Sequence, residues 1–303
     1  MAPAPKRRQC GTQQVNERLC EQFYGLRERQ NRIEERIRRS IVTGEAQRVT
    51  RLLITIPVVV HVVYKTDAEN ISDVQVASQI DALNRDYRLQ NDDKSAIPGV
   101  WQGLATDVNV EFALATKDPA GKKSTGITRT KTTRDSFGTG DSVKMKAGGG
   151  HPAWPSARYL NLWTCNLGDG LLGYAQFPGG PAKTDGVVIL YTAFGTSGAV
   201  QAPFNLGRTA THEVGHWLNL RHVWGDRSDC GGTDFVTDTP NAQLPNYGKP
   251  KFPHITCNNG PNGDMFMNYM DYVDDASMTM FTAGQVARMN ATLAGPRKTI
   301  GGR

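Results

Sequence analysis

The residues H-E-V-G-H-W-L-N-L-R-H, from His212 to His222, contain three of the six histidines in the chain. On a helix with 3.6 residues per turn, His212 and His216 project from one face and can bind the same metal ion. His222 comes six residues after His216 and would lie on another side of a straight helix. The backbone must therefore turn between the second and third histidines if all three bind one ion.

We place this turn at Asn219. The longer metal-binding pattern H-E-x-x-H-x-x-G-x-x-H has a glycine at that position, which ends the helix with a positive φ and returns the last histidine to the metal. Asparagine is the non-glycine residue that best tolerates the left-handed region. The sequence therefore predicts a helix end near Asn219, although the usual glycine is missing.

Glu213 follows the first histidine directly. Three neutral imidazoles leave a tetrahedral Zn(II) ion one open position, which is typical of a catalytic site. Zinc lowers the pKa of a water bound there from ~15.7 towards ~7, and a neighbouring carboxylate can accept its proton as the water attacks a carbonyl. We expect Glu213 to be that general base. Chance occurrence of H-E-x-x-H on an amphipathic helix is the alternative, and the third histidine at the required offset argues against it.

The run from residue 212 to about residue 289 resembles the pappalysin family of metzincin zinc peptidases, in particular its ulilysin-like branch. The resemblance rests on the histidine motif, on N-Y-M-D-Y-V-D-D at 268–275, on C-G-G-T-D at 230–234 and on M-F-T at 280–282. It implies a zinc endopeptidase that acts on protein or peptide substrates. It also implies an α+β fold with a twisted mixed sheet, a backing helix, the zinc helix and an irregular lower subdomain.

The same resemblance assigns roles around the metal. Met270 would form the methionine turn beneath the zinc, with simple core filling as the alternative and Met267 as a competing residue. Tyr272 would help to stabilise the tetrahedral intermediate. Asp275 would lie at the floor of the S1' pocket and favour Arg or Lys just after the scissile bond.

Five cysteines leave at least one thiol unpaired within a single chain. The resemblance implies a disulfide between Cys230 and Cys257, which favours an oxidising compartment. Cys165 falls in an apolar alternating stretch and is expected to be a buried free thiol.

The segment after His222 is rich in Asp, Gly, Asn and Pro, and it could supply the oxygen ligands that Ca(II) requires. The family has calcium near this loop, which implies Asp234 and Thr239 as ligands. Solvated turn residues without a metal are the alternative.

Residues 1–50 are predicted to be a propeptide, and residues 51–303 the catalytic domain. Apolar residues at three- and four-residue spacing predict an amphipathic helix over 12–40, which Gly25 can break. The preceding R-Q-C-G, at 8–11, resembles the cysteine switch of metzincin zymogens, in which a thiolate occupies the fourth zinc position. Cys10 is therefore a candidate zinc ligand of the latent form, and a free leader thiol or a Cys10–Cys20 disulfide is the alternative.

Removal of the leader is expected at the bond between Thr50 and Arg51. An enzyme that prefers a basic residue after the scissile bond could cut there by itself. The leader would then act as an intramolecular inhibitor until its own enzyme removes it.

Strand and helix patterns follow the leader. We expect strands over 52–64, 108–115, 159–165 and 186–192, and helices over 73–89, 209–220 and 282–293. In metzincins the strand that borders the cleft binds extended substrate by main-chain pairing. Residues 171–175, with Gly173 and Tyr174, are our candidates for that edge. His61 is expected to pack in the sheet rather than bind metal.

Charge and hydropathy exclude other classes of function. The net charge is +6, but residues 1–50 hold 11 basic and 6 acidic residues, whereas the remainder holds 24 and 23. The peptidase part is thus nearly neutral, which argues against a nucleic-acid partner. No run of 18 apolar residues predicts a membrane span.

Residues 2–8 are small and basic and do not form a secretory apolar region, so an export signal would have been removed earlier or export would follow another route. We nevertheless expect a secreted monomer. A silent metzincin-like binding protein is a further alternative, and the intact Glu213 argues against it.

Overall fold

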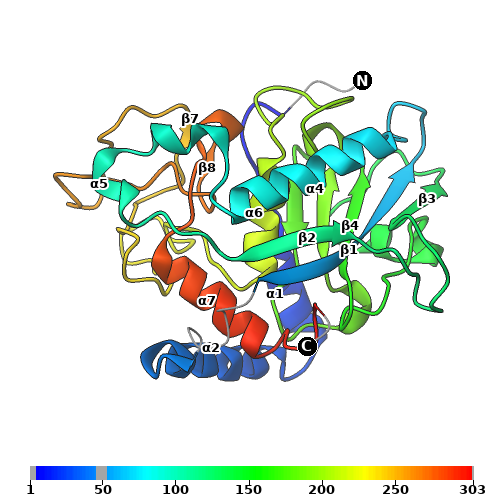
Figure 1. Cartoon of the computed structure of the whole chain (residues 1–303), viewed down its shortest axis with the longest axis horizontal. Coiled ribbons are helices and arrows are strands. Elements are labelled where there is room, and N and C mark those ends of the chain that lie inside the picture. The colour runs from blue at the N-terminus through cyan, green and yellow to red at the C-terminus, as the bar shows by residue number, and fades with distance from the viewer. Residues whose placement is uncertain (1–4, 46–52, 302–303) are drawn as a thin grey trace.

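Strand β1 (Ile54–Tyr64) forms the centre of the main sheet. Its valines at 58–60, 62 and 63 are all buried, so the strand is covered on both faces. β-branched side chains favour extended backbone, and a strand buried on both faces has a continuous apolar sequence. The computed structural model describes residues 5–45 and 53–301 (Figure 1).

The main sheet has the order β2-β1-β4-β6-β5, and β3 pairs with the second half of β1. All pairs are parallel except the last, in which β5 runs antiparallel to β6. The short strand β5 therefore forms a free edge within the range 171–175 expected from the sequence. The strand bounds are β2 (Val110–Leu114), β3 (Ile127–Lys131), β4 (Leu160–Cys165), β5 (Gly173–Ala175) and β6 (Val187–Leu190).

Two helices connect this sheet to the metal-binding motif. α4 (Asp73–Tyr87) packs against β2 and α6, and α6 (Arg208–Trp217) packs against β5 and β6. α4 is capped by Ser72, whose hydroxyl accepts a hydrogen bond from the Gln75 amide. α6 is three residues shorter at its end than the predicted helix, because the chain turns before Asn219. A short helix, α5 (Gly99–Gln102), comes between α4 and β2 in the sequence and lies on the side of β7 and β8 in Figure 1.

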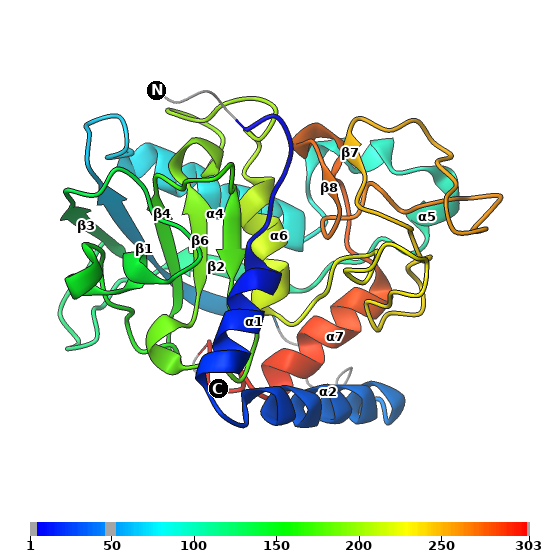
Figure 2. The ribbon, with the colours of Figure 1, turned by 180° about the vertical axis from the view of Figure 1, so that it is seen from behind.

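The leader forms two helices, as the glycine in its middle permits. α1 (Thr12–Gln22) and α2 (Leu26–Val42) are separated at Gly25, which has a φ of 77°. α1 packs against β5, and α2 runs along the last helix, α7 (Ala283–Ala294) (Figure 2). The predicted boundary between residues 50 and 51 lies outside the described residues.

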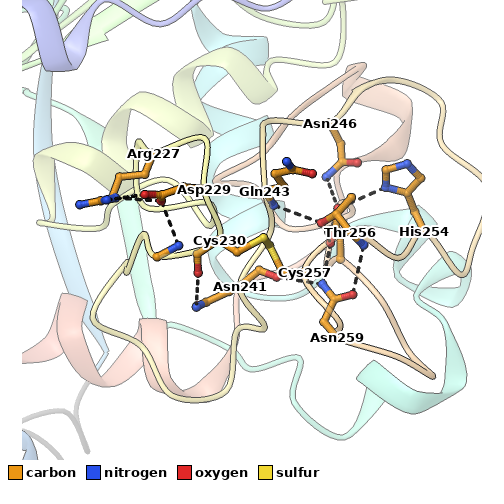
Figure 3. Close-up of a disulfide and its surroundings, with 12 residues drawn as sticks. Arg227, Asp229, Cys230, Asn241, Gln243, Asn246, His254, Thr256, Cys257 and Asn259 are labelled. Atoms are coloured by element: carbon orange, nitrogen blue, oxygen red, sulfur yellow. Dashed lines mark hydrogen bonds and ion pairs between the residues drawn. A yellow bond between two sulfur atoms is a disulfide. The ribbon is translucent and has the colours of Figure 1, made fainter.

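The region between α6 and α7 is mainly irregular, as predicted for the lower subdomain. Its strands are β7 (Tyr247–Gly248) and β8 (Tyr272–Val273), which pair in parallel. The predicted disulfide joins Cys230 to Cys257 across two of its loops (Figure 3). The Asn241 amide donates to the Cys230 carbonyl beside this bridge. Together these contacts give the irregular loops fixed connections.

The remaining cysteines and His61 also agree with expectation. Cys10, Cys20 and Cys165 are free, and Cys165 is buried. His61 lies buried in β1, where its ring nitrogens contact Thr128 and Asn161. Within the described ranges, no helix has both the length and the apolar character that a membrane crossing requires.

Candidate active site

Helix α6 carries two histidines and ends where the chain can return the third. His212 and His216 are fully buried on this helix. The helix ends at Trp217, and Asn219 has a φ of 72°, the left-handed conformation that its place in the motif requires. The chain then turns back, and His222 stacks on the His212 ring with centroids 5.2 Å apart.

The three imidazoles direct their Nε2 atoms at one point. Nε2 of His216 lies 3.1 Å from Nε2 of His212 and 3.0 Å from Nε2 of His222. With Sγ of Cys10, four possible ligand atoms lie within 4.8 Å of one another. Burial lowers the pKa of His212 and His216 well below the ordinary value, which favours the neutral form that binds metal. This set of nitrogen and sulfur donors fits zinc, with the cysteine at the fourth position.

Glu213 faces the same space from α6. Its Oε2 lies 3.3 Å from Sγ of Cys10 and accepts a hydrogen bond of 2.9 Å from the Thr12 hydroxyl. Burial raises the pKa of Glu213 to about 7, although both contacts and the charge of Arg8 favour its ionised form. The predicted base thus lies beside the metal position, and the leader covers it.

The leader also occupies the free edge of the sheet. The Gly11 amide donates to the Gly173 carbonyl at 2.9 Å, and the Leu172 amide donates to the Gln9 carbonyl at 3.0 Å. Cys10 and Gly173 form a parallel bridge. A Cβ at Gly173 would lie 3.0 Å from Cγ of Glu213, so glycine lets the edge approach the site closely. The main chain of the predicted edge can therefore pair with an extended segment, and in this structure that segment is the leader.

Tyr174, the other residue predicted at this edge, has its side chain elsewhere. Its ring is fully buried, and Nζ of Lys144 lies 4.9 Å from the ring centroid. Tyr174 pairs through its backbone with Val188 of β6. Side chains alternate across a strand, so the Tyr174 side chain lies on the face opposite to the Gly173 position, which faces Glu213. Its position supports the edge strand rather than a side-chain contact.

A second leader side chain fills an acidic pocket beside the metal position. Nη2 of Arg8 lies 2.6 Å from Oδ1 of Asp275, and both side chains are buried. The same guanidinium donates to the Val273 carbonyl and to the Thr209 hydroxyl. The other Asp275 oxygen accepts a hydrogen bond of 2.7 Å from the Leu206 amide. Asp275 is thus a fixed, buried acid that holds a basic side chain.

The residues predicted below and beside the metal lie close to the histidines. The Tyr272 ring has its centroid 4.9 Å from that of His222 and 5.7 Å from that of His212. Met270 is fully buried beneath α6. A Cβ at Gly215 would lie 2.5 Å from its Sδ, so the methionine packs into space that only glycine leaves open.

The acidic residues of the loop after His222 have different hydrogen-bond partners. Asp234 and Thr239, the predicted calcium ligands, are buried together, with the Thr239 hydroxyl 2.7 Å from Oδ2 of Asp234. Burial raises the pKa of Asp234 to about 6. Asp238, another oxygen donor of this loop, instead accepts hydrogen bonds at the start of α7. Asp226 contacts His222.

Sequence reasoning missed several contacts of the site. Arg8 was recognised only as part of the cysteine motif, yet it is the partner of Asp275. Thr12 and its hydrogen bond to Glu213 carried no sequence signal. Asp226 was not singled out, although its place four residues after His222 could have suggested a contact with that ring.

Comparison with known proteins gives consistent relatives. A family model described as pregnancy-associated plasma protein-A matches residues 150–294. An extracellular metalloprotease of Pyricularia oryzae is 33% identical over 251 residues, which cover 80% of this chain and 75% of the relative. One of Arthroderma benhamiae is 32% identical over 243 residues, with 78% and 76% covered.

Two solved structures, one of a proprotein and one of a mature protein, resemble the chain. A mutant of promirolysin from Tannerella forsythia superposes with a TM-score of 0.85 at 45% identity, covering 97% of each chain. Mature mirolysin from the same organism, in complex with a cleaved peptide, gives a TM-score of 0.80 at 52% identity. That match covers 82% of this chain and 95% of the mature protein.

Proposed function

This chain belongs to the pappalysin family of zinc metalloproteases, and we propose that it is the latent form of a secreted endopeptidase. After removal of the leader, the enzyme would act as a monomer on protein or peptide substrates. The zymogen fold supports latency, because the likeness to promirolysin includes the leader. Curated relatives named extracellular metalloproteases support secretion.

In the proposed mechanism, His212, His216 and His222 would hold a zinc ion, which would supply Lewis-acid chemistry when bound. Glu213 accepts the proton of the attacking water and passes it to the leaving amine. Tyr272 donates a hydrogen bond to the carbonyl oxygen as that oxygen gains negative charge. The buried surroundings strengthen each of these electrostatic contacts.

The ion pair between Arg8 and Asp275 is the observation that carries the specificity proposal. The pair is buried and includes a direct N–O contact of 2.6 Å. Arg8 is two residues before Cys10, so one short segment of leader fills both the metal position and the neighbouring acidic pocket. A substrate with Arg or Lys at P1' would place the same positive charge beside the Asp275 carboxylate. We therefore assign Asp275 to recognition of a basic P1' residue.

Latency follows from the same segment in this proposal. Cys10 takes the fourth ligand position, and Gly11 pairs with Gly173 where an extended substrate would bind. The leader must leave before either place becomes free. Self-cleavage between Thr50 and Arg51 suits the proposed P1' preference, and that bond lies outside the described residues.

Calcium is proposed as a second, structural cofactor near Asp234 and Thr239. Their oxygens lie together in a buried position on an irregular loop. A cation there would neutralise the Asp234 carboxylate and hold the loop to one conformation.

The specificity proposal is tested by peptide cleavage with Asp275→Asn after removal of the leader. Loss of charge should reduce kcat/KM for peptides with Arg or Lys at P1' by about tenfold or more, while peptides with an uncharged P1' residue lose little. Asp274→Asn is the matched control, because Asp274 is the neighbouring acid and lies partly exposed. Equal losses on charged and uncharged peptides would reject Asp275 as the specificity residue.

A further inference from the structure

The outer nitrogens of the three histidines have different kinds of partner. Nδ1 of His212 lies 2.7 Å from the Tyr269 carbonyl, and Nδ1 of His216 lies 2.8 Å from the Leu220 carbonyl. Nδ1 of His222 lies 2.5 Å from Oδ1 of Asp226. Among these three histidines, therefore, only His222 is held at its outer nitrogen by a side chain, and that side chain is an acid.

The local backbone conformation brings Asp226 to His222. Gly225 has a φ of 64° and Asp226 a φ of 57°, which turns the chain back towards His222. A Cβ at Gly225 would lie 2.1 Å from the Thr233 amide nitrogen, so the close loop requires glycine. The Trp224 ring stacks on His222 with centroids 4.3 Å apart and an interplanar angle of 8°. Stacking and the hydrogen bond in the ring plane together fix the direction of Nε2.

The leader reaches the second oxygen of the same carboxylate. Nε2 of Gln13 donates to Oδ2 of Asp226 at 2.5 Å. Gln13 is three residues after Cys10, in the first turn of α1. The leader thus contacts the metal position through Cys10 and the outer side of His222 through Gln13 and Asp226.

We propose that Asp226 is a positioning residue for the zinc site, an inference that rests on the proposed function. Its carboxylate accepts a hydrogen bond from Nδ1–H of His222, which fixes the tautomer with a free electron pair on Nε2 and makes the imidazole a stronger ligand. The other two histidines obtain the same tautomer from backbone carbonyls, which substitution does not remove. Among the outer partners of the three histidines, Asp226 is therefore the one whose side chain can change zinc affinity without being a ligand.

The test is a competition between the matured protein and a chelator for zinc. Asp226→Asn keeps an acceptor but loses the charge, whereas Asp226→Ala loses both, so zinc affinity should fall from wild type to Asn to Ala. Outer partners of this kind typically change metal affinity by about 10- to 100-fold. Asp229→Asn is the control, because Asp229 lies on the same loop, is exposed and pairs with Arg227. Its zinc affinity should equal that of wild type.

Equal zinc affinity in both Asp226 variants and in the control would overturn the assignment while leaving the proposed peptidase intact. A wild-type chain that binds no zinc would overturn the proposed function and this assignment together. Melting of the zinc-free variants separates a folding defect from a ligand defect. A fall in zinc affinity that is matched by an equal loss of zinc-free stability would count against positioning.

A second inference rests on a different contact, between α2 and α7. Glu34 of α2 forms a bidentate ion pair with Arg288 of α7, at 2.7 and 2.8 Å. Arg288 is 2% exposed, and its Nη2 also lies 3.4 Å from the Asn219 carbonyl. Nδ2 of Asn219 is in turn 3.4 Å from Oε2 of Glu34. The leader helix therefore touches the turn between the zinc histidines on the side of α7.

The apolar stripe of α2 supports this attachment. Ile37 is buried against Ala291 of α7, with Ile33 and Ile41 packed beside them. Departure of α2 would leave the Arg288 guanidinium without this carboxylate and next to a second cation, Arg221. Departure of α2 therefore breaks a charge-assisted bidentate contact, so the pair favours the latent form.

We infer that Glu34 is a second latch of the leader, independent of Cys10; this inference also rests on the proposed latency. The test compares activation half-times of the full-length chain and of Glu34→Gln. The variant should activate at least about threefold faster, because a charge-assisted bidentate contact is lost. Glu35→Gln is the matched control, since Glu35 is the next residue and its half-exposed side chain pairs with Arg38.

Equal half-times for the Glu34 and Glu35 variants would overturn the latch. Cys10→Ser in the same assay shows whether latency itself is present. Faster activation of Cys10→Ser with an unchanged Glu34→Gln would thus reject the latch and keep the zymogen. Peptidase activity in all full-length chains from the start would reject the zymogen as well.

Discussion

Glu213 is the residue on which the proposed chemistry depends most. It is buried beside Cys10 and adjacent in sequence to the first histidine. Glu213→Gln keeps the size of the side chain and removes the proton acceptor, so kcat should fall by about 10²- to 10⁴-fold. Zinc content should stay at one ion per chain, because the three histidines are unchanged.

Steady-state kinetics and metal analysis of the matured variant check this prediction. Glu111→Gln on β2 is a suitable control, because that carboxylate pairs with Arg88 away from the histidines. Near-normal turnover in Glu213→Gln would mean that another group is the base.

Single residues also show how far sequence reasoning reaches. The left-handed Asn219 could be predicted because the motif demands a turn there and few residue types allow it. The pairing of Arg8 with Asp275 could not, because 267 positions separate the two residues and neither carries a local signal for the other. The side-chain direction of Tyr174 likewise depends on the register of β5 with β6.

At the scale of elements, we propose that the leader helix α1 and the segment before it form the inhibitory unit. Cys10 is held at the metal position by Gly11, which pairs with the sheet edge, and by Thr12, which binds Glu213. Cys10→Ser replaces a strong zinc ligand with a weak one. The full-length variant should therefore activate at least about tenfold faster than wild type.

Gel analysis of leader loss over time measures this rate. Cys20→Ser is the matched control, because Cys20 is a free cysteine of the leader helix α1. Its thiol contacts Gln30 rather than the histidines. A Cys10 variant as slow as the Cys20 variant would exclude the thiol from latency.

The acidic loop makes a pH-dependent prediction for calcium. Burial raises the pKa of Asp234 to about 6, above its unfolded value. Without a cation, the protonated acid favours folding, and that contribution is lost as pH rises through about 6. Ionised Asp234 then needs a cation, so EGTA at constant zinc should lower the melting temperature more at pH 7.5 than at pH 5.

Differential scanning calorimetry with and without EGTA supplies the measurement. Asp234→Asn should remove most of the response at the higher pH, whereas the exposed Asp229→Asn should keep it. Identical melting with and without EGTA at both pH values would remove calcium from the proposal.

At the scale of the molecule, the main elements could be predicted because their signals are local. Apolar periodicity predicted the strands and helices, and α4 and α7 begin within one residue of the predicted starts. The family resemblance supplied the mixed sheet, the backing helix, the irregular lower subdomain and the Cys230–Cys257 pairing. The seating of α2 on α7 could not be predicted, since an amphipathic helix shows that it has a partner but not which one.

The whole chain combines a preformed catalytic geometry with a leader that fills it. The leader contacts the metal position, the proposed S1' acid Asp275 and the last helix. Figure 2 shows its helix α2 beside that last helix, α7. Activity should therefore appear only when residues 1–50 are lost as a unit. The new N-terminus is expected at Arg51.

The most direct measurement is the zinc content of the purified full-length chain together with its cleavage of a peptide library before and after incubation. The account predicts one zinc per chain throughout, little cleavage at first, and cleavage before Arg and Lys that emerges with loss of residues 1–50. N-terminal sequencing should then give Arg-Leu-Leu-Ile. A chain that retains zinc but hydrolyses nothing after the leader is removed would contradict the account and favour a silent binding protein.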